Sequence, residues 1–351
     1  MSNLETGTGT SRVMFLNSGD ATQNLNAENL TTDYMFIPEE QIVVPDHHNI
    51  IMSLYHTAIP HSFYNFRFNR NCRLDYAATA YNTTAAADSG FIELKEGTYN
   101  AQSLMTQITT KINLVAGGTL SMTFNRDTLK YAWNWVGAGA GSQRLTLRLA
   151  NGANADVNFK NEIGFNKNKW IGGVEYDVYF ENDGANFRCG YSTDAASTQL
   201  FTTGTTTTLW DGYNTADTIN YFSAVDVMAS IRSLYVRTNL TTNSILDSSI
   251  GGGYSSILAR IPIDVSSSDV ITISPSDGSV HKLLLKVKYI TSFSVRLTDQ
   301  KNRLVDLNGL DWDISVQFDF EEIPDLKPPP KDKRLKVQDH QYKRFKDTKK
   351  E

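Results

Sequence analysis

The stretch that indicates the fold most clearly is residues 306–318, with the sequence DLNGLDWDISVQF. It contains Asn308-Gly309, a dipeptide typical of tight turns between strands. Apolar side chains then occupy alternate positions of the segment that follows: Trp312, Ile314, Val316 and Phe318. Because successive side chains of a strand point to opposite faces, this pattern predicts a half-buried strand whose apolar face meets a core.

The same two-residue period recurs elsewhere in the chain. We expect further strands at 50–59, 91–95, 283–287 and 293–297. Residues 119–136 contain two alternating runs around a polar turn, which predicts a hairpin. Three large aromatic residues share one face of its second strand: Tyr131, Trp133 and Trp135.

Helical patterns are few. In residues 100–114, apolar side chains lie four positions apart after Asn100, a favourable residue for capping a helix N-terminus. Residues 158–165 predict one further short helical turn. The stretches rich in Gly, Ser and Thr between the periodic segments are expected to be loops.

These patterns predict an all-β protein, a jelly-roll β-sandwich with one or two short helices in the crossings and extended terminal arms. Residues 1–32, rich in Asn, Thr, Gly and Ser, are expected to form an N-terminal arm. Residues 33–325 would be the jelly-roll domain, with loop insertions at about 137–142 and 202–228. Residues 326–351 would form a tail that begins near a proline run.

Positive charge is concentrated in that tail. Residues 327–351 carry ten bases and four acids, a net charge of +6, whereas the rest of the chain has 23 bases and 34 acids, a net charge of −11. The three prolines at 328–330 favour an extended junction. The tail is either a solvated terminus without a role or an arm that contacts an acidic partner. In the second case the contacts would come from Lys327, Lys331, Lys333, Arg334, Lys336, Lys343, Arg344 and Lys346.

Composition excludes several classes of protein. With 351 residues, 40% hydrophobic and 20% charged, the chain can form a packed core and is not wholly disordered. No apolar run approaches the ~20 residues of a membrane helix, and nothing near Met1 resembles a signal peptide. The net charge of −5 argues against a general nucleic-acid binder. Two cysteines, Cys72 and Cys189, cannot form a disulfide framework, which predicts a reducing, cytoplasm-like compartment.

The histidines and cysteines do not predict a metal site. Four of the six histidines lie between positions 47 and 61, but His56 and His61 would point to opposite faces of a continuous strand. His47 and His48 fall in an expected turn, where polar residues are common. Cys72 and Cys189 are better explained as structural thiols. The sequence therefore predicts neither a metal nor another cofactor.

Catalytic patterns are equally weak. Asp311 and Asp313 would share one strand face, and paired acids can hydrolyse glycosides, but neighbouring acids on a strand are commoner as a solvated face. The glycine-rich stretches at 137–141 and 251–253 lack the Lys-Ser/Thr pair or helix start of a phosphate-binding loop. We therefore expect that the chain is not an enzyme.

Four segments of the C-terminal half occur in a distinctive order: SLYVRTNL (233–240), SILARIPI (256–263), FSVRLTDQ (293–300) and DLNGLDWDISVQF (306–318). Together they resemble the penton-type minor capsid proteins of polinton-like viruses, virophages and large eukaryotic double-stranded DNA viruses. Weaker resemblances to the same family are found in AIPHSFYN (58–65), GTYN (97–100) and EIGF (162–165). The resemblance covers roughly residues 33–322.

The resemblance implies a structural capsid protein without a cofactor. Five copies would form a ring at each five-fold vertex of an icosahedral virion, among double-jelly-roll major capsid proteins. The expected partners are further copies of the chain as a homopentamer, the major capsid protein and other minor capsid proteins, with no specific nucleic acid. The basic tail would reach an inner membrane or another acidic partner. The protein would be located in the virion shell after assembly in the host cytoplasm or a viral factory.

Two other functions remain open. The chain could be a cement protein between or beneath capsomers, since the sequence specifies no symmetry. It could also be a receptor- or glycan-binding jelly roll, for which Trp210, Asp211 and Tyr213 are candidate site residues. A jelly-roll enzyme would need clustered histidines or facing carboxylates, and the sequence supplies neither pattern.

Overall fold

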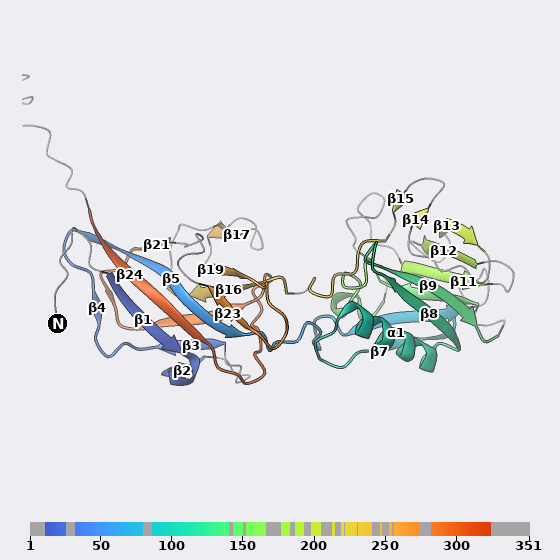
Figure 1. Cartoon of the computed structure of the whole chain (residues 1–351), viewed down its shortest axis with the longest axis horizontal. Helices are drawn as coiled ribbons and strands as arrows, with labels where there is room; N and C mark the ends of the chain where they lie inside the picture. The colour runs from blue at the N-terminus through green and yellow to red at the C-terminus, as the bar shows by residue number, and fades with distance from the viewer. Residues whose placement is uncertain are drawn as a thin grey trace, which may run out of the picture.

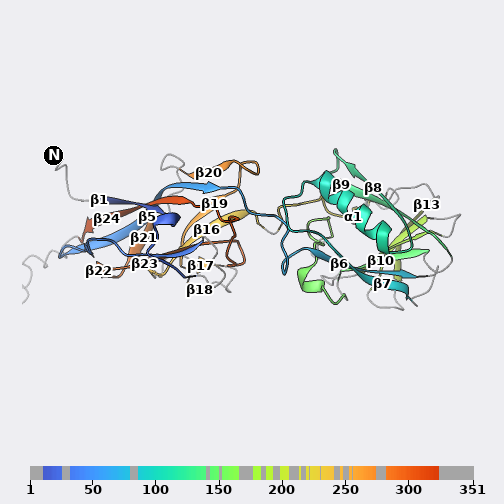
Figure 2. The ribbon, with the colours of Figure 1, turned by 90° about the horizontal axis from the view of Figure 1, so that it is seen from below.

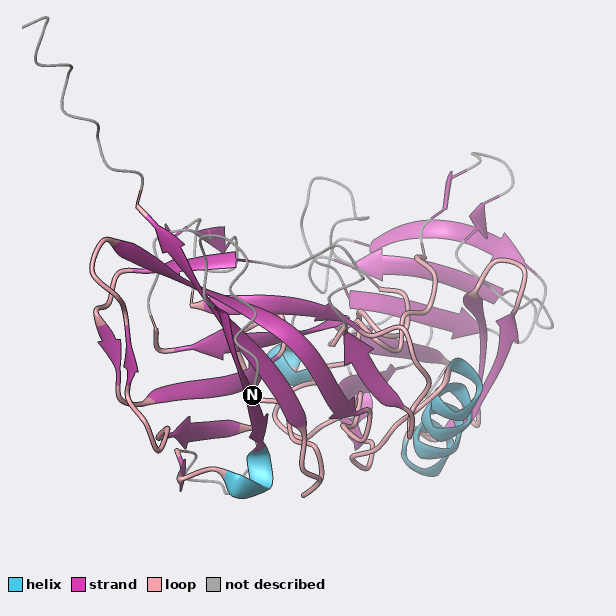
Figure 3. Cartoon of the chain, turned by 60° about the vertical axis from the view of Figure 1, so that its left-hand side comes forward, coloured by secondary structure: helices cyan, strands magenta, loops and turns pink. Residues whose placement is uncertain are grey.

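The structure is a computed structural model with two lobes side by side along its long axis, joined by a narrow connection (Figures 1 and 2). Strands dominate both lobes, and the α-helix among the described residues lies in the second (Figure 3). The residues that the structure describes are 11–25, 32–79, 86–139, 143–149, 152–165, 177–182, 187–192, 198–204, 213–214, 219–220, 222–229, 231–240, 246–247, 253–254, 256–273 and 282–323.

The first lobe contains two antiparallel sheets. In the first sheet, β1, β24 and β5 lie side by side, and β20 and β21 pair with opposite halves of β5. The bounds of these strands are β1 (Ser11–Asn17), β5 (His48–Pro60), β20 (Val270–Ile273), β21 (Lys282–Leu285) and β24 (Asp313–Glu322). The second sheet has the order β19-β16-β23-β3-β2. Its strands are β2 (Gln23–Asn24), β3 (Asp33–Phe36), β16 (Ser233–Thr238), β19 (Ile257–Pro262) and β23 (Phe293–Thr298).

The strand order of this lobe is that of a jelly roll. Counting β20 and β21 as one interrupted strand and leaving out the two-residue strands, the chain order is β1, β3, β5, β16, β19, β20/β21, β23 and β24. The first sheet then contains strands 1-8-3-6 and the second contains strands 2-7-4-5. This arrangement of two four-stranded sheets defines the jelly-roll sandwich, so the predicted all-β fold is confirmed.

Both sheets contribute to one hydrophobic core. Apolar side chains of β24 alternate inward, and four of them are fully or almost fully buried: Ile314, Val316, Phe318 and Phe320. Leu234 and Val236 of β16 and Val295 of β23 meet them from the second sheet. The alternation that the sequence shows in 312–318 therefore does mark the core face of a terminal strand.

The second lobe is inserted between the third and fourth jelly-roll strands, β5 and β16. We call residues 66–227 the inserted domain and the first lobe the jelly-roll domain. The inserted domain has a six-stranded sheet in the order β13-β12-β11-β10-β6-β7, a β8–β9 hairpin and the helix α1. Their bounds are β6 (Arg73–Thr79), β7 (Ala86–Glu93), α1 (Ala101–Val115), β8 (Gly118–Asn125), β9 (Lys130–Gly137), β10 (Arg144–Arg148), β11 (Asp177–Asn182), β12 (Phe187–Ser192) and β13 (Thr198–Gly204).

The inserted domain has a separate core rich in aromatic residues. Trp133 of β9 stacks on Phe180 of β11, with ring centroids 5.2 Å apart. The helix α1 buries three side chains of one face in this core: Leu104, Ile108 and Ile112. Asn100 caps its N-terminus in a reciprocal hydrogen-bond pair with Ser103. The predicted helix and the predicted hairpin at 119–136 are therefore both confirmed.

The remaining elements are short. Two-residue pairs are formed by β4 (Ile42–Val43) with β22 (Tyr289–Ile290), β14 (Tyr213–Asn214) with β15 (Ile219–Asn220), and β17 (Leu246–Asp247) with β18 (Gly253–Tyr254). Among the described residues, 3₁₀ turns are formed by η1 (Ser18–Asp20) and η3 (Ala155–Val157). The segment at 158–165, predicted to be a helical turn, forms turns after η3. Within the described residues, no helix combines the length and hydropathy needed to cross a membrane.

The prediction that residues 1–32 form an arm is wrong for residues 11–17. These residues form β1, which pairs with β24 from Ser11 opposite Asp319 to Asn17 opposite Asp313. Leu16 of this strand is buried in the jelly-roll core. The polar composition of the first 32 residues as a whole favours an arm, whereas the short strand within them pairs with β24, about 300 positions later.

The structure also divides the region 33–325 in a way that the sequence does not predict. That region contains two hydrophobic cores rather than one, and the insertion is a domain rather than a pair of loops. Of the predicted loop insertions, residues 140–142 and parts of 202–228 lie outside the described residues.

A network of ion pairs joins the base of the inserted domain to a jelly-roll loop. Arg67 pairs with Asp306 at 2.5 Å and with Glu96 at 3.7 Å. Asp299, whose side chain is fully buried, lies 2.7 Å from Arg303 and 3.8 Å from Arg70. Burial and the nearby charge of Arg303 lower the pKa of Arg70. These contacts fix the connection between the two domains on the side of residues 299–306.

Candidate functional site

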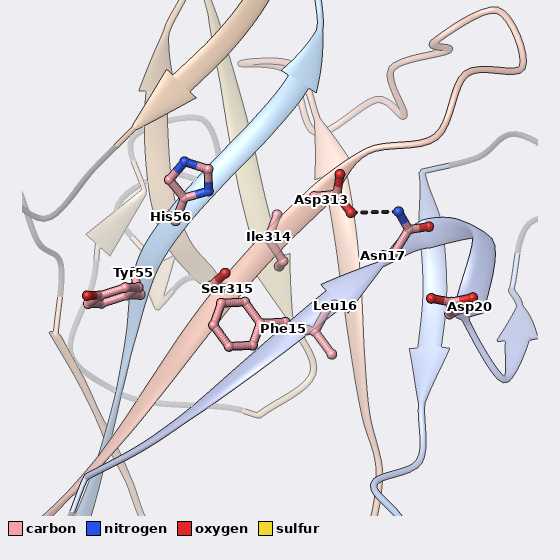
Figure 4. Close-up of a pocket in the computed structure, with 9 residues that line it drawn as sticks. All are labelled: Phe15, Leu16, Asn17, Asp20, Tyr55, His56, Asp313, Ile314 and Ser315. Carbon is pink, nitrogen blue, oxygen red and sulfur yellow. Dashed lines mark hydrogen bonds between the residues drawn. The ribbon is translucent and has the colours of Figure 1, made fainter.

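A hollow of about 550 Å³ lies on the solvent face of the sheet formed by β1, β24 and β5 (Figure 4). We call it the sheet hollow. Its lining comes from the end of β1, the following turn, the middle of β5 and the start of β24. The lining residues are Phe15, Leu16, Asn17, Asp20, Tyr55, His56, Asp313, Ile314 and Ser315.

Strand register places the side chains of the sheet hollow in a row. Phe15 lies opposite Ser315, and Ser315 lies opposite His56 on the next strand. The neighbours Leu16 and Ile314 are buried in the core, so alternation turns Phe15 and Ser315 to the solvent face. The register of β5 and β24 shifts next to Ser315, which leaves both Tyr55 and His56 exposed.

Two aromatic side chains dominate the surface of the sheet hollow. Phe15 is 78% exposed and Tyr55 is 39% exposed, whereas Ser315 between them is buried. In Figure 4, Phe15, Ser315 and Tyr55 follow one another across the three strands. Exposed apolar side chains that gather in one hollow are typical of a binding surface rather than of a random distribution.

Carboxylates lie at one end of the row. The side-chain amide of Asn17 donates to Asp313 over 2.6 Å. In the adjacent turn, the Ser18 hydroxyl donates to Asp311 over 2.8 Å and accepts from the Trp312 backbone N–H over 3.0 Å. These bonds fix the turn after β1 against the start of β24. Burial and the charge of Asp311 together raise the pKa of Tyr34.

Asp20, Asp311 and Asp313 are exposed, and none of them forms an ion pair within the part of the chain that the structure describes. The combination of aromatic faces with carboxylates suits a cationic side chain, which can lie on a ring and pair with an acid. It also suits a sugar, which stacks on a ring and donates hydroxyl groups to a carboxylate. The aromatic rings and the carboxylates attract such a ligand without reacting with it, so the arrangement is suited to binding.

The residues predicted for chemistry are placed as follows. Of the predicted acid pair Asp311 and Asp313, Asp313 lines the sheet hollow. Trp312, which lies between these two acids in the sequence, is buried in the jelly-roll core. His56 is exposed and His61 is buried, stacked on Phe63 with its Nδ1 3.1 Å from the Val265 carbonyl oxygen. His61 follows the end of β5, so the two histidines do not share one continuous strand; what the structure gives is their difference in exposure.

His47 lies in a turn with a positive φ of 59°, and His48 follows it at the start of β5, with its Nδ1 2.8 Å from the Asp46 carbonyl oxygen. The turn expected at 46–49 is therefore confined to residues 46 and 47, and residues 48 and 49 already belong to β5. Among the described residues, no group of three His, Cys, Asp or Glu is placed to hold a metal ion.

Both cysteines are free and buried in the inserted domain. Burial raises the pKa of Cys72 to about 12, with the charge of Glu96 adding to the effect, and burial also raises the pKa of Cys189 well above its ordinary value. A thiol with a raised pKa is a poor nucleophile at neutral pH, which agrees with a structural role for both.

Several predicted site residues lie outside the described part of the structure. They include all eight basic tail residues, Lys327, Lys331, Lys333, Arg334, Lys336, Lys343, Arg344 and Lys346. Trp210 and Asp211 also lie outside it, and of Tyr213 only the backbone, in β14, is described.

Phe15 and Tyr55 are not among the site residues that the sequence predicts. A signal for Phe15 exists in the run Val13-Met14-Phe15-Leu16, which is apolar at successive positions and therefore apolar on both faces of a strand. A strand that uses only one face for the core leaves the other apolar face for a ligand or partner. No comparable signal marks Tyr55, because its exposure depends on the register shift opposite β24.

Comparison with solved structures gives a structural likeness, whereas the comparisons of sequence give none. No family model matches the chain, and no curated protein matches it. Among solved structures, it is similar to the crystal structure of a mavirus penton protein, with 12% sequence identity and a TM-score of 0.43 over 89% of this chain and 100% of that chain. Because a likeness at this level carries no argument about function, the jelly-roll assignment rests on the strand order described above.

Proposed function

We propose that the chain is a structural minor capsid protein of an icosahedral double-stranded DNA virus, with five copies in a ring at each five-fold vertex. Its role would be steric and cohesive: to close the vertex and to contact the surrounding major and minor capsid proteins. Such a ring needs head-to-tail interfaces, in which each copy presents two different surfaces to its neighbours.

The observation that carries this proposal is where the penton-like segments lie in the fold. Residues 233–240, 256–263, 293–300 and 306–318 contain β16, β19, β23 and most of the core face of β24. These are the fourth, fifth, seventh and eighth strands of the jelly roll. Jelly rolls serve in capsids and in lectins, so the fold alone does not select a function. The support comes from capsid-like segments that coincide with the strands of a single jelly roll.

Exposed apolar side chains at the ends of the molecule agree with a cohesive role. Val43 and Tyr289 lie opposite each other in the β4–β22 pair, and both are largely exposed. In the inserted domain, Leu114 at the end of α1 and Leu129 in the hairpin turn are exposed as well. Apolar groups at such sites are suited to burial against a neighbouring subunit.

The first test is the mass of the purified full-length chain by light scattering behind a sizing column, followed by negative-stain electron microscopy. We expect a mass of five times 39.2 kDa and five-fold symmetric particles. A single 39.2 kDa species at every concentration used would contradict a self-sufficient vertex ring and would favour the cement role. A dimer, trimer or tetramer would contradict the vertex position outright.

The basic tail is proposed to strengthen attachment within the particle. Deleting residues 327–351 should lower incorporation of the chain into particles without changing its fold, because every described element ends before residue 324. The same deletion combined with an unrelated tail of equal length and zero net charge controls for length. Equal incorporation of the deleted and full-length chains would contradict an attachment role.

A second candidate function, glycan or receptor binding, is favoured by the sheet hollow. Phe15, Tyr55 and Asp313 provide the aromatic and carboxylate groups that such a site requires. A glycan array screened with the full chain and with Tyr55→Ala tests this function. Binding that is lost in the variant would favour a receptor role, and an empty array would count against it.

A further inference from the structure

The solvent face of the sheet β1-β24-β5 carries an excess of negative charge. The side chains of β24 that alternate with its core residues include Asp313, Asp319 and Glu321. Asp20 lies next to the same face in the sheet hollow. On the neighbouring strand β21, Lys282 lies opposite Ser53 and adds one positive charge. The face therefore has a net negative charge, with acids near both ends of β24.

The described contacts of these acids are with neutral groups. Asp313 accepts from the Asn17 amide, and Asp319 accepts from the Gln317 amide over 2.6 Å. Neither these two acids nor Asp20 and Glu321 form an ion pair within the described ranges. A neutral donor orients a carboxylate but leaves its charge available to a cation.

The aromatic groups of the sheet hollow add a second attraction for the same kind of ligand. The rings of Phe15 and Tyr55 are exposed in the hollow that Asp313 and Asp20 also line; in Figure 4 the two rings lie towards the left and the two acids towards the right. A lysine or arginine side chain over such a ring is attracted by the negative charge on the ring face. Elsewhere in the molecule, Arg144 already lies over the ring of Tyr179, 4.3 Å from its centroid. The chemistry of the face thus selects a basic peptide segment.

The chain itself contains such a segment. Residues 327–351 have a net charge of +6, the opposite sign to the face. The described chain ends at residue 323, directly after β24, so the tail starts at the far end of this sheet. The distance along β24 from Glu322 back to Ser315 is about 23 Å, at roughly 3.3 Å per residue. About eight residues of extended chain after residue 323 are enough to cover that distance. Lys331 and every basic residue after it can therefore reach the sheet hollow.

We propose that the basic tail, residues 327–351, binds the solvent face of the β1-β24-β5 sheet, with its cationic side chains on Phe15 and Tyr55 and paired with Asp20 and Asp313. The same contact can be made within one chain or with the face of a second copy, because the segment and the surface are identical in both cases. This inference does not depend on a capsid role and would hold for an isolated protein in solution.

Carbodiimide cross-linking of the full-length chain tests the proposal directly. The reagent activates a carboxylate, a lysine amine in contact with it forms an amide, and the carbodiimide leaves as its urea. We expect amide cross-links from tail lysines to Asp20, Asp313 or Asp319, identified by mass spectrometry after proteolysis. Glu39 and Glu40, in the loop between β3 and β4, and Asp127, in the hairpin turn of the inserted domain, are exposed carboxylates outside the strands of this face and serve as internal controls.

A matched pair of variants makes the result specific. In the Phe15→Ser, Tyr55→Ser double variant, cross-links to Asp20 and Asp313 should fall roughly five- to tenfold, as expected when two cation–π contacts are lost. The control Val136→Ser removes an exposed apolar side chain from β9 of the inserted domain and should leave the yield unchanged. Melting followed by circular dichroism shows that each variant is folded.

Mixing unlabelled and ¹⁵N-labelled chains before cross-linking separates the two forms of the contact. Cross-linked peptides of mixed isotope content show binding to a second copy, and peptides of single content show binding within a chain; both support the proposal. Cross-links to Glu39, Glu40 and Asp127 as frequent as those to the face would overturn it. So would a yield unaffected by the double variant, or glycan binding at the hollow without tail cross-links.

Discussion

The two domains of this chain are built from different kinds of contact. The jelly-roll domain joins residues from both ends of the sequence, since β1 pairs with β24 across about 300 positions. The inserted domain is one continuous stretch, 66–227, in which most paired strands are neighbours in sequence. Local contacts form faster than distant ones because they close shorter loops. The inserted domain is therefore expected to fold before the sandwich around it closes.

The cores differ in chemistry as well. The inserted domain buries the aromatic cluster around Trp133, together with both cysteines and Tyr131. The jelly-roll core consists mainly of aliphatic and phenylalanine side chains. The chain therefore contains two separately packed units. A mutation or a change of pH that acts on one core should affect that domain more than the other.

The largest expected effect comes from removing a large side chain from one core. Trp133→Ala should destabilise the inserted domain by about 3–5 kcal/mol, because it leaves a cavity in a packed aromatic cluster. Phe318→Ala should do the same to the jelly-roll domain. Hydrogen exchange measured by peptide should show faster exchange in residues 66–227 for the first variant and outside them for the second. If each variant lost protection from hydrogen exchange equally inside and outside residues 66–227, the two domains would not be separate units.

The connection between the domains is the next target. Asp299→Ala should destabilise the protein by about 3 kcal/mol, because it leaves Arg303 and Arg70 without their buried acid. The control Asp226→Ala breaks an ion pair with Arg232, whose side chain is 66% exposed, and should cost under about 1 kcal/mol. Urea denaturation of both variants provides the free energies. Equal effects would show that the network near Asp299 does not stabilise the connection.

Alkaline pH should act first on the inserted domain. Burial raises the pKa of Cys72 to about 12 and raises the pKa of Cys189 and Tyr131 as well, and all three belong to that core. Because the folded state holds these protons more tightly, its stability is unaffected below the ordinary thiol value of about 9 and falls as pH rises from there.

Alkylation with iodoacetamide measures this pH dependence. Both thiols should stay unreacted in the folded chain at pH 8 and should become reactive above pH 9 as the inserted domain opens. The urea-unfolded chain provides the reference rate for a free thiol, whose pKa has the ordinary value of about 9. Complete alkylation of the folded chain at pH 8 would contradict the raised pKa values.

A smaller effect is expected at the helix N-terminus. Asn100→Ala removes the side chain that accepts from the Ser103 backbone N–H over 2.8 Å, and should cost about 1 kcal/mol. Asn100→Asp keeps the acceptor and should restore most of that stability. Thermal unfolding of the two variants side by side provides the comparison. An unchanged melting temperature in Asn100→Ala would show that α1 is held by its apolar face alone.

The smallest effect is expected on the sheet hollow. Phe15→Ser should change stability by less than about 0.5 kcal/mol, because the ring is mostly exposed and supports no core. Chemical denaturation measures this. A loss of more than about 1 kcal/mol would show that the ring belongs to the jelly-roll core and not to a binding surface.

Much of the fold could be predicted because its signals are periodic and local. The alternation after Asn308-Gly309, the three aromatic residues at 131–135 and the capped helix at 100–114 each specify an element from neighbouring residues alone. The candidate site could be predicted only in part. Asp313 was visible as an acid on a strand face, whereas Phe15 and Tyr55 become a site only when β1 and β5 flank β24.

Local patterns are enough to predict that the chain is all-β, that its last strand is half-buried, and that its charge is divided between an acidic body and a basic tail. These properties depend on side-chain type and spacing, which the sequence contains directly. Tertiary structure alone decided that β1 joins the sandwich, that residues 66–227 form a second domain, and that two aromatic residues meet an acidic row. Each of these depends on pairing between strands far apart in the chain, and no local pattern records which strands become neighbours.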